Sequence, residues 1–287
     1  MWRRVVLIIA IVLLLAGLGF LLFPPVSNWY GKQVAHGQAE GFERALENVV
    51  AADDTQNNNN TGVTEKTFAA ALEKKQIDSE GYPIDENGAR KSNTRVLFQA
   101  DLDRLRRDSL AYNEELKANQ GSKFVEGESR DFPALNLENY GVFDGIYGYV
   151  SAPSIDMELP IYLGASDWNM SYGCAHMTFT SLPLGGMDTN CSVAGHTGYI
   201  GRIFFDNIQY LSPGDKVYVK NFWETLTYEV VSTDIVRPNE SQHIYIEKGS
   251  DLFTMFTCTP YDEESWGRYF VVCRRDAGNS APLEKAD

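Results

Sequence analysis

A 19-residue apolar run near the amino terminus constrains this chain more than any other feature of its sequence. Residues 5–23 include no charged and no strongly polar side chain. As a helix the run would be roughly 29 Å long, which matches the hydrocarbon core of a bilayer. We therefore expect residues 1–27 to form a short cytoplasmic tip and one transmembrane helix, with the rest of the chain folded outside the bilayer.

The flanking residues predict the orientation of this helix and argue against its removal. Arg3 and Arg4 precede the run without a balancing acidic residue, so the positive-inside rule keeps the amino end in the cytoplasm and the remainder on the extracellular side. The alternative is a cleaved signal peptide, which needs a shorter apolar core and a small-x-small cleavage site. The bulky residues at 21–26 favour an uncleaved anchor in the cell membrane. The polar stretch 279–287 predicts no second span, so we expect a single-pass protein.

The composition excludes several classes of function. The chain has 25 Lys plus Arg against 39 Asp plus Glu, a formal charge of −14, and the part after the anchor has 23 against 39, a net of −16. A general nucleic-acid binder needs a basic surface, so we expect no nucleic-acid partner. Four cysteines in 287 residues are too few for a disulfide-built scaffold. They include no C-x-x-C pair, so we expect no metal site.

The residues between the anchor and the first strand have helical and linker character. Residues 28–50 have a helical composition broken by three glycines, and the asparagine-rich tract 56–62 is typical of a solvated linker. Further on, five apolar side chains and one serine recur at helical spacing over about six turns: Phe98, Leu102, Leu105, Ser109, Tyr112 and Leu116. We expect residues 28–127 to be a helical stalk whose last helix packs across a sheet.

The pattern changes to short strands from Gly145 onward. Seven segments rich in Val, Ile, Tyr, Phe and Thr are separated by Gly, Pro, Asn and Asp: residues 146–155, 159–163, 191–196, 216–222, 225–236, 252–258 and 269–274. Seven or eight strands with little helix between them predict a closed or nearly closed β-barrel. The expected fold class is therefore mainly β, with a barrel at residues 145–276 and a polar tail at 277–287.

One cysteine and one histidine stand at the ends of predicted strands. Cys258 precedes a strand-breaking Pro260, so its thiol can be accessible, as a nucleophile must be. His196 ends the strand 191–196, where a lone histidine is more often a structural or surface residue than a base. Arg268 opens the strand that follows Cys258, and a hairpin would place both side chains across one groove, where a guanidinium suits a developing oxyanion. The alternative for Arg268 is a plain surface charge.

Several motifs follow one another in the second half of the chain: Ser181-Leu182-Pro183-Leu184-Gly185-Gly186, Cys191-Ser192-Val193-Ala194-Gly195-His196, Thr257-Cys258-Thr259-Pro260-Tyr261 and Arg268. In this order they resemble the signatures of the sortases, membrane-anchored cysteine transpeptidases of Gram-positive bacteria. These motifs are most similar to those of class C, the pilin-polymerising sortases. Three further segments are similar to that class: Tyr112-Asn113-Glu114, Leu211-Ser212-Pro213-Gly214-Asp215 and Val236-Arg237-Pro238. The similarity covers roughly residues 112–274.

The resemblance implies an eight-stranded sortase barrel with Cys258 as the nucleophile, His196 as the general acid and base, and Arg268 stabilising the substrate and the oxyanion. Thr257 and Thr259 would contact the substrate, an LPXTG-like sorting signal near the C-terminus of a secreted protein or pilin. Cleavage between Thr and Gly would proceed through a thioester. The acyl group would pass to an amine, which is a pilin lysine in class C or a cell-wall precursor in housekeeping sortases. No cofactor is implied.

Two of the departures from class C concern the site. Its members usually carry a lid with an Asp-Pro-aromatic motif before the barrel, whereas residues 128–144 contain Asp131-Phe132-Pro133, an order that fits either a lid or a plain linker. The spacing from Cys258 to Arg268 is one residue longer than is typical and resembles class B.

The other cysteines and histidines have structural interpretations. Cys174 and Cys191 flank a loop with 16 residues between them, and an extracellular disulfide there would contribute about 3 kcal/mol in the chain-entropy picture. Two buried free thiols are the alternative, and we expect the disulfide. Cys273 would pack against the barrel, His176 would be structural, and His243 lies in a polar loop.

Three classes of function follow. The first is a transpeptidase, for which pilus assembly and cell-wall anchoring both stay open. The second is a non-enzymatic, membrane-tethered surface domain that binds a partner. The third is a cysteine hydrolase of the same fold, which an added amine would not accelerate.

Overall fold

The computed structural model describes residues 2–54, 75, 78, 84–90, 102–123, 132–142, 144–199, 202–238, 240, 242–262, 265–276 and 281–282. The asparagine-rich tract 56–62, Phe98 and Asp131 lie outside the described residues, so the predictions made for them stay predictions.

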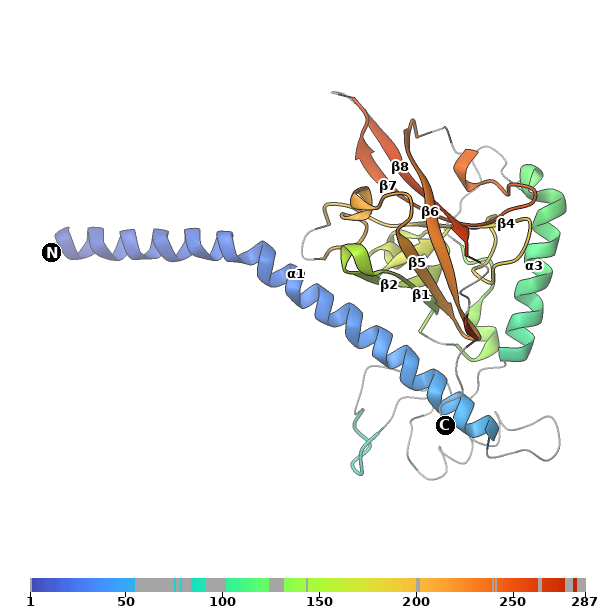
Figure 1. Cartoon of the computed structure of the whole chain (residues 1–287). Helices are drawn as coiled ribbons and strands as arrows, with labels where there is room; N and C mark the ends of the chain where they lie inside the picture. Colours follow the sequence, from blue (N-terminus) through green and yellow to red (C-terminus); the bar gives the residue numbers. More distant parts are fainter. Residues whose placement is uncertain are drawn as a thin grey trace.

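Three helices and nine strands make up the described fold (Figure 1). The helices are α1 (Trp2–Asp54), α3 (Leu102–Lys123) and α4 (Asp167–Met170). The strands are β1 (Ile146–Ala152), β2 (Met157–Leu163), β3 (Cys174–His176), β4 (Thr189–Ala194), β5 (Lys216–Asn221), β6 (Glu224–Val236), β7 (Asp251–Pro260), β8 (Trp266–Arg275) and β9 (Ala281–Pro282). Four short 3-10 helices lie in the connections, at Leu137–Tyr140, Pro153–Ile155, Ile208–Tyr210 and Gln242–Ile244.

Helix α1 is continuous, which corrects the expected interruptions at Gly31, Gly37 and Gly41. Its segment Trp2–Val34 is long and apolar enough to cross a membrane. A helical glycine costs about 1 kcal/mol relative to alanine, too little to end a helix that has other support. Pro24 and Pro25 lie inside α1, and Figure 1 shows that the helix changes direction along its length. Prolines remove backbone hydrogen bonds and are the usual cause of such a bend.

The part of α1 around Lys32 and Phe42 packs on the barrel. Phe42 is 2% exposed, and the centroid of its ring lies 5.3 Å from that of Tyr149 and 5.2 Å from that of Phe222. Lys32 forms an ion pair with Asp156, in the turn between β1 and β2. One helix therefore carries both the apolar segment and a contact with the folded domain.

The sheet closes into a barrel, as predicted. Its strand order is β5-β1-β2-β3-β4-β7-β8-β6, and β5 also pairs with β6, which completes a ring of eight strands. The β2–β3 and β4–β7 pairs are parallel, and the other pairs are antiparallel. The ninth strand adds to the start of β6, with Ala281 opposite Thr225. The other residues of the predicted polar tail at 277–287 lie outside the described residues, so that prediction stays a prediction.

All seven predicted strands are present, with bounds that shift by a few residues. The first ends at Ala152 because Pro153, which has no backbone N–H to donate, begins a 3-10 helix. The eighth strand of the ring, β3, was missed by the sequence analysis. It has only three residues, and pairing on both sides stabilises it between β2 and β4.

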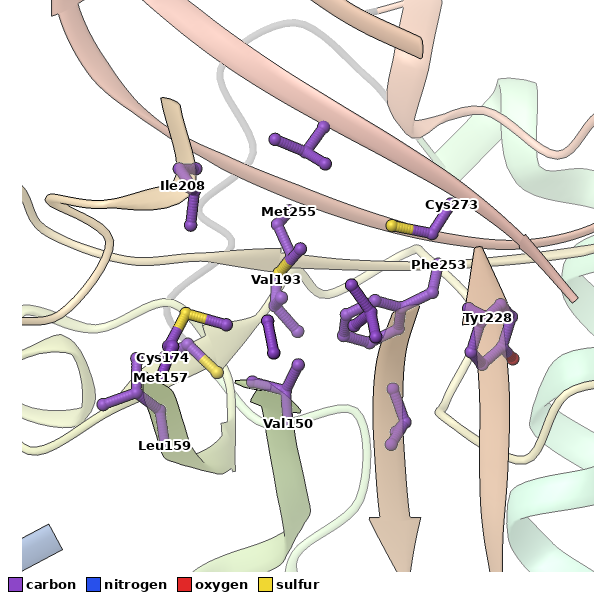
Figure 2. Close-up of a cluster of buried hydrophobic side chains, with 14 of the residues drawn as sticks. Val150, Met157, Leu159, Cys174, Val193, Ile208, Tyr228, Phe253, Met255 and Cys273 are labelled. Atoms are coloured by element: carbon purple, nitrogen blue, oxygen red, sulfur yellow. The ribbon is translucent and has the colours of Figure 1, made fainter. Parts of the chain in front are cut away.

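The barrel interior is a closely packed apolar core (Figure 2). Every residue of β4 is buried, as expected of a strand covered on both faces. In β5 buried and partly exposed residues alternate, so Val217 and Val219 face inward.

Helix α3 confirms the predicted amphipathic helix of about six turns. Leu105 and Leu116 are buried, and Tyr147 on β1 donates a hydrogen bond to Ser109 Oγ at 2.8 Å. Asn113 exchanges two hydrogen bonds with the backbone of Leu182: Leu182 N donates to Oδ1 at 2.7 Å and Nδ2 donates to Leu182 O at 3.1 Å. The helix thus covers the barrel and fixes the segment that includes residues 181–186.

The structure corrects the expected disulfide, because Cys174 and Cys191 are both free and buried. The antiparallel register of β3 and β4 sets Ala175 opposite Ala194, which places Cys174 opposite Gly195. Cys191 is therefore four positions away along the ladder, roughly 13 Å at the rise of a strand. A disulfide needs Cα atoms within about 7 Å of each other.

Candidate active site

The hairpin of β7 and β8 sets the candidate nucleophile beside the candidate arginine. In this register Cys258 is the direct partner of Arg268, so the hairpin that would place both side chains across one groove is present. The first five residues of β7 are buried in the barrel, whereas Cys258 lies beyond the core and is exposed. The strand therefore delivers the thiol to the barrel rim, where a substrate can reach it.

The parallel pairing of β4 with β7 brings the candidate histidine to the same rim. Ala194 is level with Phe256, and continuing that register by two residues places His196 level with Cys258. Two hydrogen bonds extend the pairing: Gly195 N donates to Phe256 O at 3.2 Å, and the Thr257 hydroxyl donates to Gly195 O at 2.7 Å. Residues 62 positions apart are thus joined at one end of the barrel.

Cys258, His196 and Arg268 line one pocket of about 310 Å³. The other lining residues are mostly apolar: Ala165, Met170, Met177, Ala194, Gly195, Pro238, Glu240, Ile244, Phe256, Thr257 and Phe270. The pocket can therefore hold an apolar peptide segment next to a thiol, an imidazole and a guanidinium. That combination suits nucleophilic acyl transfer, in which a base and a fixed positive charge assist the thiol.

The other three cysteines differ from Cys258 in their surroundings. Figure 2 shows Cys174 and Cys273 among the apolar side chains of the core, and Cys191 belongs to the same cluster. Burial raises the pKa of all three thiols above the usual value, so they stay protonated and unreactive at neutral pH. Within the described part of the chain, no group of three His, Cys, Asp or Glu side chains could hold a metal ion.

The remaining predicted site residues are less closely connected with the pocket. Thr257 lines it, but its hydroxyl is bonded to Gly195 O, and Thr259 is not a lining residue. Phe132 and Pro133 of the predicted lid do not line it either. The carbonyl of Phe132 accepts a hydrogen bond from the Thr178 hydroxyl. The ring of Phe132 packs against Phe179, with 5.7 Å between ring centroids. A lid that closes the pocket therefore stays a prediction.

Sequence reasoning missed several residues in or beside the pocket, and four of them bear on the site. Met170, Met177 and Glu240 line it, and Tyr199 stacks on the ring of His196. Met170 belongs to the one-turn helix α4, which carries no periodic signal because it is so short. Only Tyr199 had a usable signal, since it is an aromatic residue three positions after a candidate base.

Comparison with known proteins supports this description. The family model for the sortase domain matches residues 150–276. Sortase A of Bacillus anthracis is 27% identical over 153 residues, which cover 53% of this chain and 70% of that protein. Sortase A of Staphylococcus aureus is 32% identical over 124 residues, which cover 42% of this chain and 58% of that protein.

Solved structures give a matching fold. Sortase C1 of Streptococcus agalactiae has a TM-score of 0.52 at 25% identity, and the match covers 64% of this chain and 92% of that structure. Sortase C2 of pilus island 1 from group B Streptococcus has a TM-score of 0.50 at 30% identity, and the match covers 61% of this chain and 96% of that structure.

Barrel, pocket and comparisons together define the class of protein as a cysteine transpeptidase built on a closed eight-stranded β-barrel. The chain belongs to the sortase family.

Proposed function

We propose that this chain is a membrane-anchored sortase that cleaves an LPXTG-like sorting signal between Thr and Gly and transfers the acyl part to an amine. The observation that carries the proposal is the convergence of Cys258, His196 and Arg268 on one mostly apolar pocket. Cys258 is paired directly with Arg268, and the parallel strand β4 brings His196 level with Cys258.

The reaction has two steps whose atoms and protons balance. The Cys258 thiolate attacks the Thr carbonyl carbon, the Thr–Gly C–N bond breaks, and the protonated imidazole of His196 gives its proton to the leaving glycine amine. An acceptor amine then attacks the thioester and His196 takes a proton from it. The C–S bond breaks and the Cys258 thiolate is restored. The thioester keeps the acyl group activated between the two steps.

Arg268 provides a permanent positive charge at the point where negative charge develops. A guanidinium does not lose its proton at physiological pH, so it can stabilise the oxyanion in both steps without competing for the proton of His196. Its backbone is held on a strand rather than a loop and is paired with that of Cys258, so the side chain starts from a fixed point beside the thiol.

We propose a pilin lysine as the acceptor amine. Support comes from the match with solved sortase C structures, one of them from a pilus island. A second candidate is the amine of a cell-wall precursor, because the matching curated relatives are sortases A. In both cases we propose that α1 anchors the enzyme with Arg3 and Arg4 in the cytoplasm and the barrel on the extracellular side.

The test is mass spectrometry of the full chain in detergent after incubation with LPXTG peptides and candidate acceptors. We expect an acyl adduct on Cys258 whose mass corresponds to cleavage after Thr, and its transfer to an added amine. The Cys258→Ala variant should form neither product. A protein that binds the peptide equally well with and without the thiol, and never forms an adduct, would refute the proposal. Release by water alone, without acceleration by an amine, would indicate a hydrolase.

A further inference from the structure

We propose that Tyr199 is a positioning residue that holds the His196 imidazole in the orientation needed for proton transfer. The two rings stack nearly parallel, with 5.6 Å between centroids and 16° between planes. This inference rests on the proposed sortase chemistry, in which His196 exchanges a proton with two different amines. The motifs from which the family resemblance was drawn do not include Tyr199.

Hydrogen bonds at Gly195 and at the carbonyl of His196 hold the backbone of His196 in place. Only the orientation of its imidazole ring is still free to vary. Gly195 is bonded to β7 through Phe256 and Thr257, and Phe205 N donates to the carbonyl of His196 at 2.9 Å. A Cβ atom at Gly195 would lie 2.7 Å from the Phe205 ring, which is too close for any side chain. The backbone at Gly195 therefore packs directly against that ring. The imidazole still has two side-chain torsions, which the fixed backbone limits to a few rotamers without selecting one of them.

The ring of Tyr199 can restrict those torsions because it is itself restrained. Its edge contacts Phe204, a core residue that is 3% exposed, with 5.5 Å between ring centroids and 63° between planes. The loop that carries it is fixed by Asp206, whose carboxylate accepts hydrogen bonds from Gly198 N at 2.7 Å and Phe204 N at 3.0 Å. An aromatic pair of this geometry stabilises the fold by more than the burial of its apolar surface alone.

The hydroxyl of Tyr199 connects the stack to the end of α4. It donates to Ser171 Oγ at 3.4 Å, and Ser171 is the residue that caps the end of α4. Arg202 Nη1 in turn donates to the carbonyl of Ser171 at 2.8 Å. Because Met170 of α4 lines the pocket, Tyr199 spans from the candidate base to the wall that the substrate would contact.

The predicted consequence is a loss in the chemical steps rather than in peptide binding. Tyr199 does not line the pocket, so its removal leaves the peptide contacts in place. A ring that samples several orientations spends less time in line with the amine, and small errors of alignment reduce proton-transfer rates strongly. We expect Tyr199→Leu to lower kcat about tenfold with little change in KM, whereas Tyr199→Phe keeps the stack and stays within about twofold of the wild type.

The experiment uses the full chain in detergent with an LPXTG peptide and an amine acceptor. The matched control is Tyr210→Leu, which removes an equally large, 68% exposed tyrosine from the same connection between β4 and β5 and should leave kcat unchanged. Because Tyr199 is 41% exposed, its replacement leaves the core intact, which thermal unfolding would verify.

A spectroscopic measurement tests the stack without reference to catalysis. The chain has four histidines, so ring-labelled histidine gives few NMR signals, and the His196→Gln variant identifies the one of interest. We expect the ring protons of His196 to be shifted by the Tyr199 ring current in the wild type and in Tyr199→Phe, and to lose that shift in Tyr199→Leu.

The two readouts separate this inference from the proposed function. Wild-type activity with no fall in kcat for Tyr199→Leu would overturn the positioning role and leave the sortase chemistry standing. An unshifted His196 signal in the wild type would overturn it as well. If the wild type forms no Cys258 adduct, the proposed function fails, and the positioning role fails with it.

Discussion

Cys258 and Cys273 lie on the two strands of one hairpin, yet the barrel gives their thiols opposite surroundings. Cys273 is 0% exposed in the apolar core, and burial raises the pKa of its thiol. Cys258 is exposed at the rim, opposite a guanidinium. The histidines repeat the contrast, because His176 is 0% exposed and His196 is half-buried in the pocket. The comparison teaches that depth in the barrel, rather than residue type, decides which thiol and which imidazole can take part in chemistry.

The largest expected difference is between the two cysteines. Cys258→Ala removes the nucleophile and should reduce acyl transfer by at least about a thousandfold. Cys273→Ala leaves a small cavity in the core, so it should lower the free energy of unfolding by about 1–2 kcal/mol and leave transfer nearly unchanged. Peptide-cleavage rates and urea denaturation measure the two effects. Residual transfer in Cys258→Ala at a tenth of the wild-type rate would contradict the assignment.

The second prediction compares two arginines on β8. Arg268→Ala removes the charge opposite Cys258, and loss of such a stabilising group should lower kcat by about a hundredfold to a thousandfold. Arg274 forms a surface ion pair with Glu247, 3.5 Å between charged atoms, with both side chains more than half exposed. Its replacement by alanine should change neither kcat nor stability appreciably. Equal losses from the two variants would show that overall charge, and not position, matters.

The third prediction concerns the buried histidine. Nε2 of His176 lies 3.1 Å from the carbonyl oxygens of both Thr180 and Ser181, so it must donate a proton there. Burial lowers the pKa of His176 to about 4, below the value of about 6.5 in an unfolded chain. The unfolded state therefore binds the proton first, and stability should fall as the pH drops from about 6.5 to 4, by on the order of 3 kcal/mol.

Two histidine variants isolate the contribution of His176 to the pH dependence of stability. In His176→Gln the part of the pH dependence that comes from this residue should disappear, whereas His196→Gln should keep it. Urea denaturation at a series of pH values between 7 and 4 makes the comparison. Identical pH profiles for the wild type and His176→Gln would show that the buried imidazole is not responsible.

The smallest expected effect is the absence of a response to reductant. Because Cys174 and Cys191 are free, the melting temperature of the full chain should be the same with and without dithiothreitol. A disulfide closing that loop would contribute about 3 kcal/mol, so its reduction would lower the melting temperature by several degrees. A drop of that size would show that the two sulfurs are joined in the protein.

The sequence predicted those features that depend on local pattern. The runs of β-forming residues located seven strands of the barrel, and the ten-residue step from Cys258 to Arg268 allowed the hairpin that the structure contains. The resemblance to sortases identified the fold, and the comparisons confirm it. The resemblance also pointed to Cys258, His196 and Arg268, and the structure brings all three to one pocket.

Features that depend on tertiary contacts could not be predicted. Strand β3 has only three residues and forms because two neighbours pair with it. Helix α1 continues through its glycines, and Phe42 packs on the barrel. The disulfide was wrongly expected because loop length says nothing about strand register. The stack of Tyr199 on His196 depends on the path of the chain after β4, which no periodicity encodes.

The parallel pairing of β4 and β7 has a consequence for how such an enzyme can diversify. Both strands point their carboxyl ends at one rim, so the thiol and the imidazole are aligned by the ladder and not by the length of chain between them. Insertions and deletions in the connection that follows β6 can then remodel the surroundings of the rim without disturbing that alignment. Changes in the loops between strands can therefore admit new substrates while the Cys258 thiol and the His196 imidazole keep their relative positions.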